Sequence, residues 1–383
     1  MSTKSEIQSA LCAEIMTPEQ LRESREYHRR GLYCTLISQF WGLCVSAVIA
    51  FWLARPATEW LSAQCPFLAA HTYALLVVFL LAIMLFEGVL GFPLDVYDDW
   101  VLEQKFGLSN LTFGHWFRRY MLHFVLGAIL NLVVVGGIFF LIRLCGPWWW
   151  AAVSVMFLFF SVVLGILFPV LILPLFYKVE RLEKPSLMER FEKITRPTTL
   201  KLTGIYRLDL SIETNKANAM LGGLGSTRRV LLGDTLLENF TEDEITAVFA
   251  HEVGHHVHRH ILKQCGMIFL GSFAVFWLID LALKYWLGPE MVYSQFPVWA
   301  VPFLSLILSL LSFFAGPFGN AVSRRFERQA DAYALKTASP AAMRSAFVKL
   351  AVQNKADPFP HPLEVFWLHS HPAIGERILN CDK

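Results

Sequence analysis

Six long apolar runs constrain the fold of this 383-residue chain more than any other feature. A helix needs about 20 apolar residues to cross the hydrocarbon core of a bilayer. Runs of that length occur near 33–54, 67–91, 120–143, 147–176, 261–287 and 298–320. Only 17% of the residues are charged, compared with roughly 25% in soluble domains. The sequence therefore predicts a mainly α-helical, polytopic membrane protein with about six transmembrane helices, and it argues against a cytosolic enzyme.

The basic residues predict the orientation of these helices. Of the 33 Lys and Arg residues, 30 lie in the polar segments 1–32, 92–119, 177–263 and 321–383. Only Arg55, Arg143 and Lys284 fall on or near the opposite side. Because cytoplasmic loops carry the excess of basic residues, both termini and both large polar segments are expected to face the cytoplasm. The net charge of +2 gives no support for nucleic-acid binding.

The chain divides into an N-terminal membrane region, 1–176, with four spans, and a C-terminal region, 177–383, with two more. In the second region, a charged helix is expected from Val179 to about Thr195, and alternating runs over 204–212 and 219–232 predict a small β-sheet. Residues 321–383 are expected to be helical until a proline-broken tail that begins near Pro358.

One segment carries a metal-binding pattern. Thr241 and Glu244 form a capping box, which predicts that a helix begins there. That helix contains His251 and His255, whose spacing of four places both imidazoles on one face. Glu252 lies beside them and is able to reach a metal-bound water. This H-E-x-x-H arrangement is typical of zinc peptidases and predicts one zinc ion.

The third zinc ligand has two candidates. Glu327 follows the sixth apolar run and lies four residues before Asp331, so both carboxylates share one helical face. Glu327 would bind zinc while Asp331 would accept a hydrogen bond from a ligand histidine. Taken alone, the pair is more typical of a charged, solvated helix face, since three arginines surround it. Beside the H-E-x-x-H pattern, a zinc ligand is the favoured interpretation. His258, about one turn beyond His255, is the rival ligand.

The placement of both motifs suggests where the site lies. His255 is six residues before the fifth apolar run, and Glu327 follows the sixth by a similar distance. The two zinc-binding helices are therefore expected to continue two transmembrane helices, which would hold the site at the cytoplasmic membrane face.

From about Glu87 to Arg377, these motifs and their order resemble the integral-membrane zinc endopeptidases of the type 1 CAAX prenyl protease family, a group of Glu-ligand zincins. Besides H-E-x-x-H and E-x-x-A-D, the resemblance includes Glu103–Gly107, Phe168-Pro169, Asn218-Ala219, Val230–Leu236 and Ser370-His371-Pro372.

The resemblance implies roles for individual residues. His251, His255 and Glu327 would be the zinc ligands, and Glu252 would be the general base. Asp331 would support a ligand, Asn218 would hold the substrate backbone, and His371 would steady the oxyanion. It also implies a water-filled chamber within the membrane helices. The chain departs from the family in having six spans where eukaryotic members have seven, and Pro372-Ala373 where a second proline is common. These departures affect the chamber and the preference for prenylated substrates.

The predicted function is therefore a membrane-embedded zinc endopeptidase that cuts peptides or proteins, including prenylated C-terminal peptides, near the cytoplasmic membrane face. The alternatives are an HtpX-like quality-control protease, a non-enzymatic polytopic protein such as a transporter, and a zinc-stabilised but inactive scaffold. The C-terminal residues show no retention signal, which favours a bacterial inner membrane over the endoplasmic reticulum. The sequence does not indicate an oligomeric state.

Overall fold

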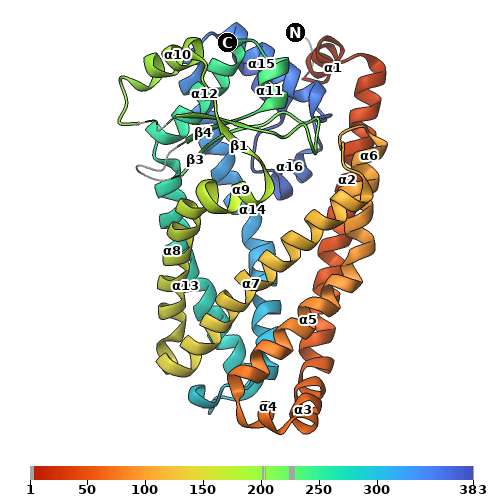
Figure 1. Cartoon of the computed structure of the whole chain (residues 1–383), viewed down its shortest axis with the longest axis vertical. Helices are drawn as coiled ribbons and strands as arrows, with labels where there is room; N and C mark the ends of the chain where they lie inside the picture. Colours follow the sequence, from red (N-terminus) through yellow and green to blue (C-terminus); the bar gives the residue numbers. More distant parts are fainter. Residues whose placement is uncertain (1–3, 201, 203, 224–228, 383) are drawn as a thin grey trace.

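The computed structural model describes residues 4–200, 202, 204–223 and 229–382. The molecule is elongated. Long helices run through one end, whereas the sheet, the shorter helices that cover it and both termini gather at the other end (Figure 1). This arrangement separates a membrane part from a polar part, as the apolar runs predict.

Five helical stretches within the described residues are long and apolar enough to cross a membrane, namely Pro18–Gln64, Thr72–Lys105, Phe113–Phe176, His260–Leu287 and Val298–Thr337. The third stretch contains two helices, α7 (Phe113–Cys145) and α8 (Trp149–Leu167), which pack against each other. They are joined at Gly146, whose φ of 55° is a conformation that glycine adopts without strain. This reversal accounts for the two separate runs predicted at 120–143 and 147–176.

The remaining helical segments include the main helices of the first two membrane stretches. Their bounds are α1 Lys4–Ile15, α2 Pro18–Val48, η1 Ile49–Leu53, α3 Ala54–Gln64, α4 Pro66–Ala70, α5 Thr72–Asp95, η2 Val96–Leu102, α6 Glu103–Lys105, η3 Gly146–Trp148, η4 Phe168–Ile172, α9 Leu173–Phe176, α11 Asp234–Asn239, η6 Tyr293–Gln295 and η7 Val298–Ala300.

A cluster of polar side chains links α8 to α13 near the turn between α7 and α8. Asp280 of α13 (His260–Leu287) is 2% exposed. It accepts hydrogen bonds from Trp149 Nε1 at 2.7 Å and from the Tyr293 hydroxyl at 2.8 Å, and it pairs with Lys284 at 2.7 Å. Since buried polar groups need partners, this network fixes how α8 lies against α13.

The polar end contains a four-stranded mixed sheet of order β1-β2-β4-β3. The strands are β1 Val179–Arg181, β2 Ile205–Leu208, β3 Ala219–Gly222 and β4 Arg229–Gly233. β2 and β4 are parallel, and the other two pairings are antiparallel. β3 is therefore an edge strand. The expected small sheet is confirmed, although part of the expected 219–232 run, including Gly225-Ser226, lies outside the described residues.

Two local expectations for the polar segments are wrong. Val179–Arg181 forms β1 instead of the first turn of a helix, because these residues pair with β2; α10 then starts at Pro185 and ends at Thr195. A proline at the first helical position is a common helix start. The proline-broken tail also contains two helices, α16 (Pro362–Leu368) and α17 (Ile374–Cys381).

The two motif-bearing helices meet the membrane differently. α14 runs without interruption from Val301 to Thr337, so the expected continuation of the sixth span through Glu327 is confirmed. The H-E-x-x-H helix, α12 (Glu242–Val257), does not continue directly into α13. Arg259 adopts left-handed backbone angles (φ 55°, ψ 38°) between them, which ends the first helix and starts a second.

Candidate active site

The helix that carries His251 and His255 is anchored at its N-terminus. The Thr241 hydroxyl accepts from the backbone N–H of Glu244, and the Glu244 carboxylate accepts from the backbone N–H of Thr241, which is the predicted capping box. Glu244 also accepts hydrogen bonds from Ser345 and Lys349 of α15 (Pro340–Gln353). Burial opposes the charge on Glu244, but these donors outweigh it and lower the pKa of its carboxyl. The start of α12 is thus fixed to α15.

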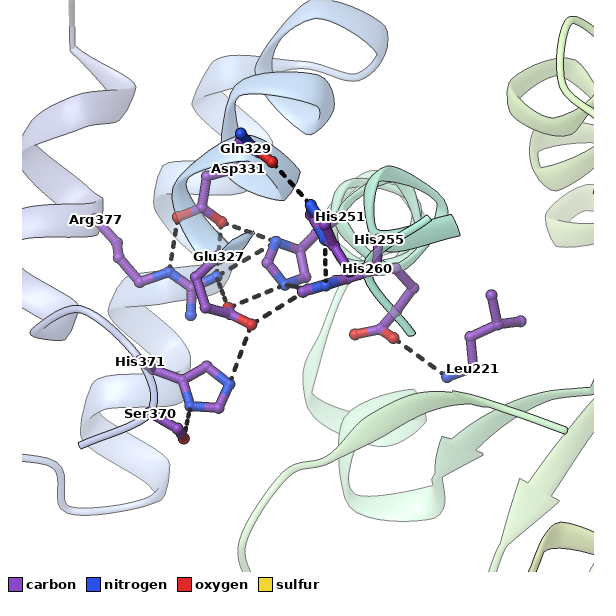
Figure 2. Close-up of polar contacts among 11 residues, drawn as sticks. Leu221, His251, His255, His260, Glu327, Gln329, Asp331, Ser370, His371 and Arg377 are labelled. Atoms are coloured by element: carbon purple, nitrogen blue, oxygen red, sulfur yellow. Dashed lines mark hydrogen bonds and ion pairs between the residues drawn. The ribbon is translucent and has the colours of Figure 1, made fainter. Parts of the chain in front are cut away.

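A close contact between α12 and α14 brings the two halves of the site together. Gly254 lies against Ala330, and a Cβ built on Gly254 would be only 2.9 Å from the Ala330 Cα. One turn along each helix, Glu327 faces His251 and His255 (Figure 2). The structure therefore brings together the three residues that the resemblance implies as zinc ligands.

The donor atoms of these residues have the separations that a tetrahedral metal requires. His251 Nε2 lies 3.1 Å from His255 Nε2 and 3.4 Å from Glu327 Oε2, and His255 Nε2 lies 3.2 Å from Glu327 Oε1. Zinc bonds of about 2.0–2.2 Å would place tetrahedral ligands about 3.3–3.5 Å apart. Glu327 Oε2 is buried and makes no hydrogen bond to any described residue. The donor set therefore fits a metal cation.

Asp331 and Arg377 hold the far side of His251. His251 Nδ1 donates to Asp331 Oδ1 at 2.8 Å, which leaves Nε2 as the nitrogen with a lone pair facing the other ligands. Arg377 in turn donates from Nε and Nη2 to both oxygens of Asp331, at 2.9 and 2.7 Å. Burial disfavours a charged His251, yet its bonds to Asp331 and Glu327 raise its pKa to about 9. Surroundings that stabilise a proton here would also stabilise a metal cation.

A second series of hydrogen bonds, through His260 and Gln329, orients His255. His260, which is 1% exposed, lies with Nδ1 3.0 Å from His255 Nδ1 and with Nε2 2.9 Å from Gln329 Oε1. Donation from His260 Nε2 to the Gln329 carbonyl makes His260 Nδ1 an acceptor. His255 must then donate from Nδ1, and its Nε2 keeps a lone pair for the metal. Each ligand histidine thus has its own supporting acceptor.

Sequence reasoning did not assign roles to His260, Gln329 or Arg377. His260 was visible as part of the histidine-rich stretch that follows the motif, but the rival candidate was a different residue of that stretch. His258 follows the last residue of α12, and its ring faces His260 and Tyr333. It does not belong to the donor cluster that His251, His255 and Glu327 form.

Glu252 lies between the metal-ligand cluster and the edge of the sheet. Its carboxylate accepts a hydrogen bond of 3.2 Å from the backbone N–H of Leu221 in β3 (Figure 2). Leu221 lies opposite Val230 of β4, and its bond to Glu252 shows that this N–H points outward from the sheet. Asn218, which directly precedes β3, is placed by a hydrogen bond from the Gly233 N–H to its carbonyl.

His371 approaches the same cluster from the C-terminal segment. Its Nε2 lies 3.5 Å from Glu327 Oε1, its Nδ1 lies 2.9 Å from the Ser370 hydroxyl, and its side chain is 60% exposed. Desolvation lowers the pKa of His371, and although Glu327 opposes this shift, Arg377 and the two ligand histidines add to it. A largely neutral His371 with one exposed edge is suited to contacting a bound substrate.

A cavity of about 310 Å³ opens beside these residues. His251, Glu252, Glu327, His371 and Asn218 all line it. The opposite wall is mostly apolar and is formed by Leu236, Val248, Met343, Phe347, Leu350, Ala351 and Ile374. The structure thus gathers the Glu252 carboxylate, the donor cluster of His251, His255 and Glu327, and a strand edge around one pocket.

Both halves of the chain match known protein families. Residues 2–178 match the family described as the CAAX prenyl protease N-terminal region with five membrane helices, and residues 181–383 match peptidase family M48. The chain is 28% identical to the uncharacterized metalloprotease YhfN of Bacillus subtilis, over 97% of this chain and 87% of that protein.

Eukaryotic proteins are similar as well. The human CAAX prenyl protease 1 homolog is 27% identical, over 79% of this chain and 72% of its own length. The crystal structure of S. mikatae Ste24p superimposes with a TM-score of 0.85 and 25% identity, over 97% of this chain and 90% of that one. Because the M48 match alone covers more than half of the sequence, the chain belongs to peptidase family M48 and is a membrane metalloprotease.

Proposed function

We propose that this protein is a zinc endopeptidase that cleaves peptides at the membrane face, with His251, His255 and Glu327 as zinc ligands. The observation that carries the proposal is the set of donor separations of 3.1, 3.2 and 3.4 Å among these residues. Two imidazoles and one carboxylate form the ligand set of many catalytic zinc sites, which leaves a fourth position open. Membership of a peptidase family argues against a transporter.

When bound, zinc supplies a Lewis acid that acidifies water and polarises the scissile carbonyl. Glu252 takes the proton of the attacking water and passes it to the leaving amine. The Nε2 of His371 donates to the developing oxyanion, an interaction worth about 3–4 kcal/mol for a well-placed donor. Asp331 and Arg377 keep His251 in the tautomer that binds metal.

The substrate backbone would lie along β3. This strand is at the edge of the sheet, and its Leu221 N–H points to the active side, where it contacts Glu252. An extended peptide pairs with such an edge through main-chain hydrogen bonds. Asn218, at the start of the strand, would hold the peptide next to the cleaved bond.

The pocket favours an aliphatic side chain beside the cleaved bond. Its wall of Leu, Val, Met, Phe and Ile side chains offers no charged partner except the catalytic residues and Arg377. A C-a-a-X peptide places aliphatic residues after its modified cysteine, so the pocket supports a CAAX-type substrate. The match of residues 2–178 to the CAAX prenyl protease N-terminal model also favours this class over the HtpX-like alternative.

The proposed site faces the cytoplasm of a cell or the matching side of an internal membrane. The support is the distribution of 30 of the 33 basic residues on the side that carries the termini and the sheet. A bacterial inner membrane remains the favoured location.

Two measurements test this function. Glu252→Gln should retain one zinc ion in the active site and lose peptide cleavage; substantial zinc-dependent cleavage by this variant would disprove the role of Glu252. A farnesylated C-terminal peptide should be cut faster than the same peptide without the lipid. Equal rates for the two peptides would refute the preference for prenylated substrates and leave a general membrane peptidase.

A further inference from the structure

A second group of metal-binding side chains lies outside the active site. It consists of His28 on α2, Glu364 on α16 and His369, which follows α16. One ligand atom from each residue lies within 4.8 Å of the other two. His28 Nε2 is 2.6 Å and His369 Nε2 is 2.9 Å from Glu364 Oε1. None of these residues belongs to the ligand set proposed for catalysis.

Hydrogen bonding alone does not account for this group. Both imidazoles present Nε2 to the same carboxylate oxygen, but only His369 makes a hydrogen bond to it, at 2.9 Å. The His28 nitrogen is buried, and despite its closeness to Glu364 it makes no contact with hydrogen-bond geometry among the described residues. A buried ring nitrogen without an aligned partner is costly, and a metal ion in the plane of the ring would satisfy it.

The surrounding structure holds two of the three residues in place. Arg324 of α14 donates from Nη1 to the carbonyls of Val365 and His369, at 2.8 and 2.7 Å. Asn320, one turn earlier, donates to the Trp367 carbonyl at 2.8 Å. The α16 segment is therefore fixed on α14 before any ion binds, and it presents Glu364 and His369 toward α2.

The third residue comes from the opposite end of the chain. α2 packs against α14, and the His28 ring meets the His369 ring edge-to-face with centroids 5.8 Å apart. The three side chains are 9–27% exposed, so an ion here would be shielded from bulk water yet reachable. The packing of α2 and α16 against α14 brings the three side chains together before any ion binds.

We propose that His28, Glu364 and His369 bind a second zinc ion, which bridges the N-terminal helix α2 to the C-terminal segment that carries His371. Two imidazoles and a carboxylate suit zinc, whereas magnesium and calcium prefer oxygen ligands alone. Zinc bonds of about 2.0–2.2 Å would widen the observed separations to about 3.3 Å. Rotation of the partly exposed side chains supplies this small adjustment.

The test is the number of zinc ions bound per chain in the detergent-solubilised full-length protein, equilibrated with buffered zinc and measured by elemental analysis. The wild-type protein should hold two ions. Glu364→Gln, which keeps the size and the hydrogen-bonding carbonyl of the side chain, should hold one, and His369→Gln should also hold one. His361→Asn is the matched control, because it alters a neighbouring histidine while keeping a side chain able to cap α16 at Leu363; it should hold two.

A Glu327→Gln background separates this site from the catalytic one. That variant should keep one ion, which a further Glu364→Gln substitution removes. Two results would overturn the bridging site. In the first, the wild-type protein holds one ion and Glu364→Gln still holds it. In the second, Glu364→Gln and His369→Gln both hold two ions, as the wild-type protein does. In a third possible result, the wild-type protein holds one ion, which Glu364→Gln loses and Glu327→Gln keeps. This result would support the bridging site and refute the proposed catalytic ligands.

Discussion

Gly254 sets the distance between the two helices that form the active site, and adding a single methyl group there should impair the enzyme. A Cβ at this position would lie 2.9 Å from the Ala330 Cα, 3.0 Å from the Ala330 carbonyl oxygen and 3.1 Å from the Tyr333 Cβ. Carbon atoms in ordinary contact are about 3.5–4.0 Å apart. In Gly254→Ala, α12 and α14 must therefore separate by at least about 0.5 Å.

This displacement acts directly on the ligand set. His255 Nε2 and Glu327 Oε1 are now 3.2 Å apart, and metal sites tolerate errors of only about 0.2 Å in bond length. A misplacement of 1 Å in an active site costs about 10²-fold in rate, so about 0.5 Å should cost about tenfold. Overpacking lowers the free energy of unfolding by about 1–3 kcal/mol. Replacing glycine by alanine within a helix raises it by about 1 kcal/mol. The net loss of stability should be about 0–2 kcal/mol.

Three measurements on Gly254→Ala follow: zinc affinity by competition with a chelator, kcat/KM on a fluorogenic peptide, and the thermal midpoint in detergent. Zinc affinity and kcat/KM should each fall about tenfold, with a small decrease in midpoint. Gly266→Ala is the matched control, since a Cβ at this α13 position meets no atom within 4 Å. If Gly254→Ala keeps the zinc affinity and activity of Gly266→Ala, the helix contact does not control the site.

Three further predictions concern supporting residues. His260→Ala should weaken zinc binding by about 10–100-fold, as is typical when the partner of a ligand histidine is removed. His258→Ala should leave the zinc affinity unchanged. Equal effects of the two variants in a chelator titration would refute the tautomer assigned to His255. Because Glu244 has a lowered pKa, its contribution to stability is present above its ordinary value of 4.5 and is lost as the pH falls through the lower folded value. Glu244→Gln should therefore lower the thermal midpoint at pH 7 and make it less sensitive to acid, and an unchanged pH profile would contradict this. Asp280→Ala should lower the free energy of unfolding by about 1–3 kcal/mol for each donor that it leaves unsatisfied, including the buried Trp149 N–H. Asp280→Asn should lower it less. Equal thermal midpoints for the two variants would argue against the network.

Much of this architecture was predictable because the decisive patterns are short and local. The apolar runs predict membrane helices from length alone. The spacing of His251 and His255, and of Glu327 and Asp331, predicts which side chains share a helix face. The structure then brings those two faces together. Whether each residue has its proposed role in catalysis stays a prediction for the experiments above.

What the sequence did not predict depends on contacts between distant segments. Val179–Arg181 was expected to be helical, and it becomes a strand because β2 offers it a partner. The role of His260 follows from the position of Gln329, nearly seventy residues later, and the pairing of His28 with Glu364 joins opposite ends of the chain. No local periodicity reports such contacts.

The left-handed Arg259 has a mechanical consequence. α14 continues as one helix from its membrane stretch to Glu327, with Pro317 inside it. Because of the break between α12 and α13, no continuous helix joins the histidine pair to the α13 membrane span. Tilt responds to bilayer thickness. A change in tilt would therefore reach the site along α14, and α12 would follow it through the Gly254–Ala330 contact.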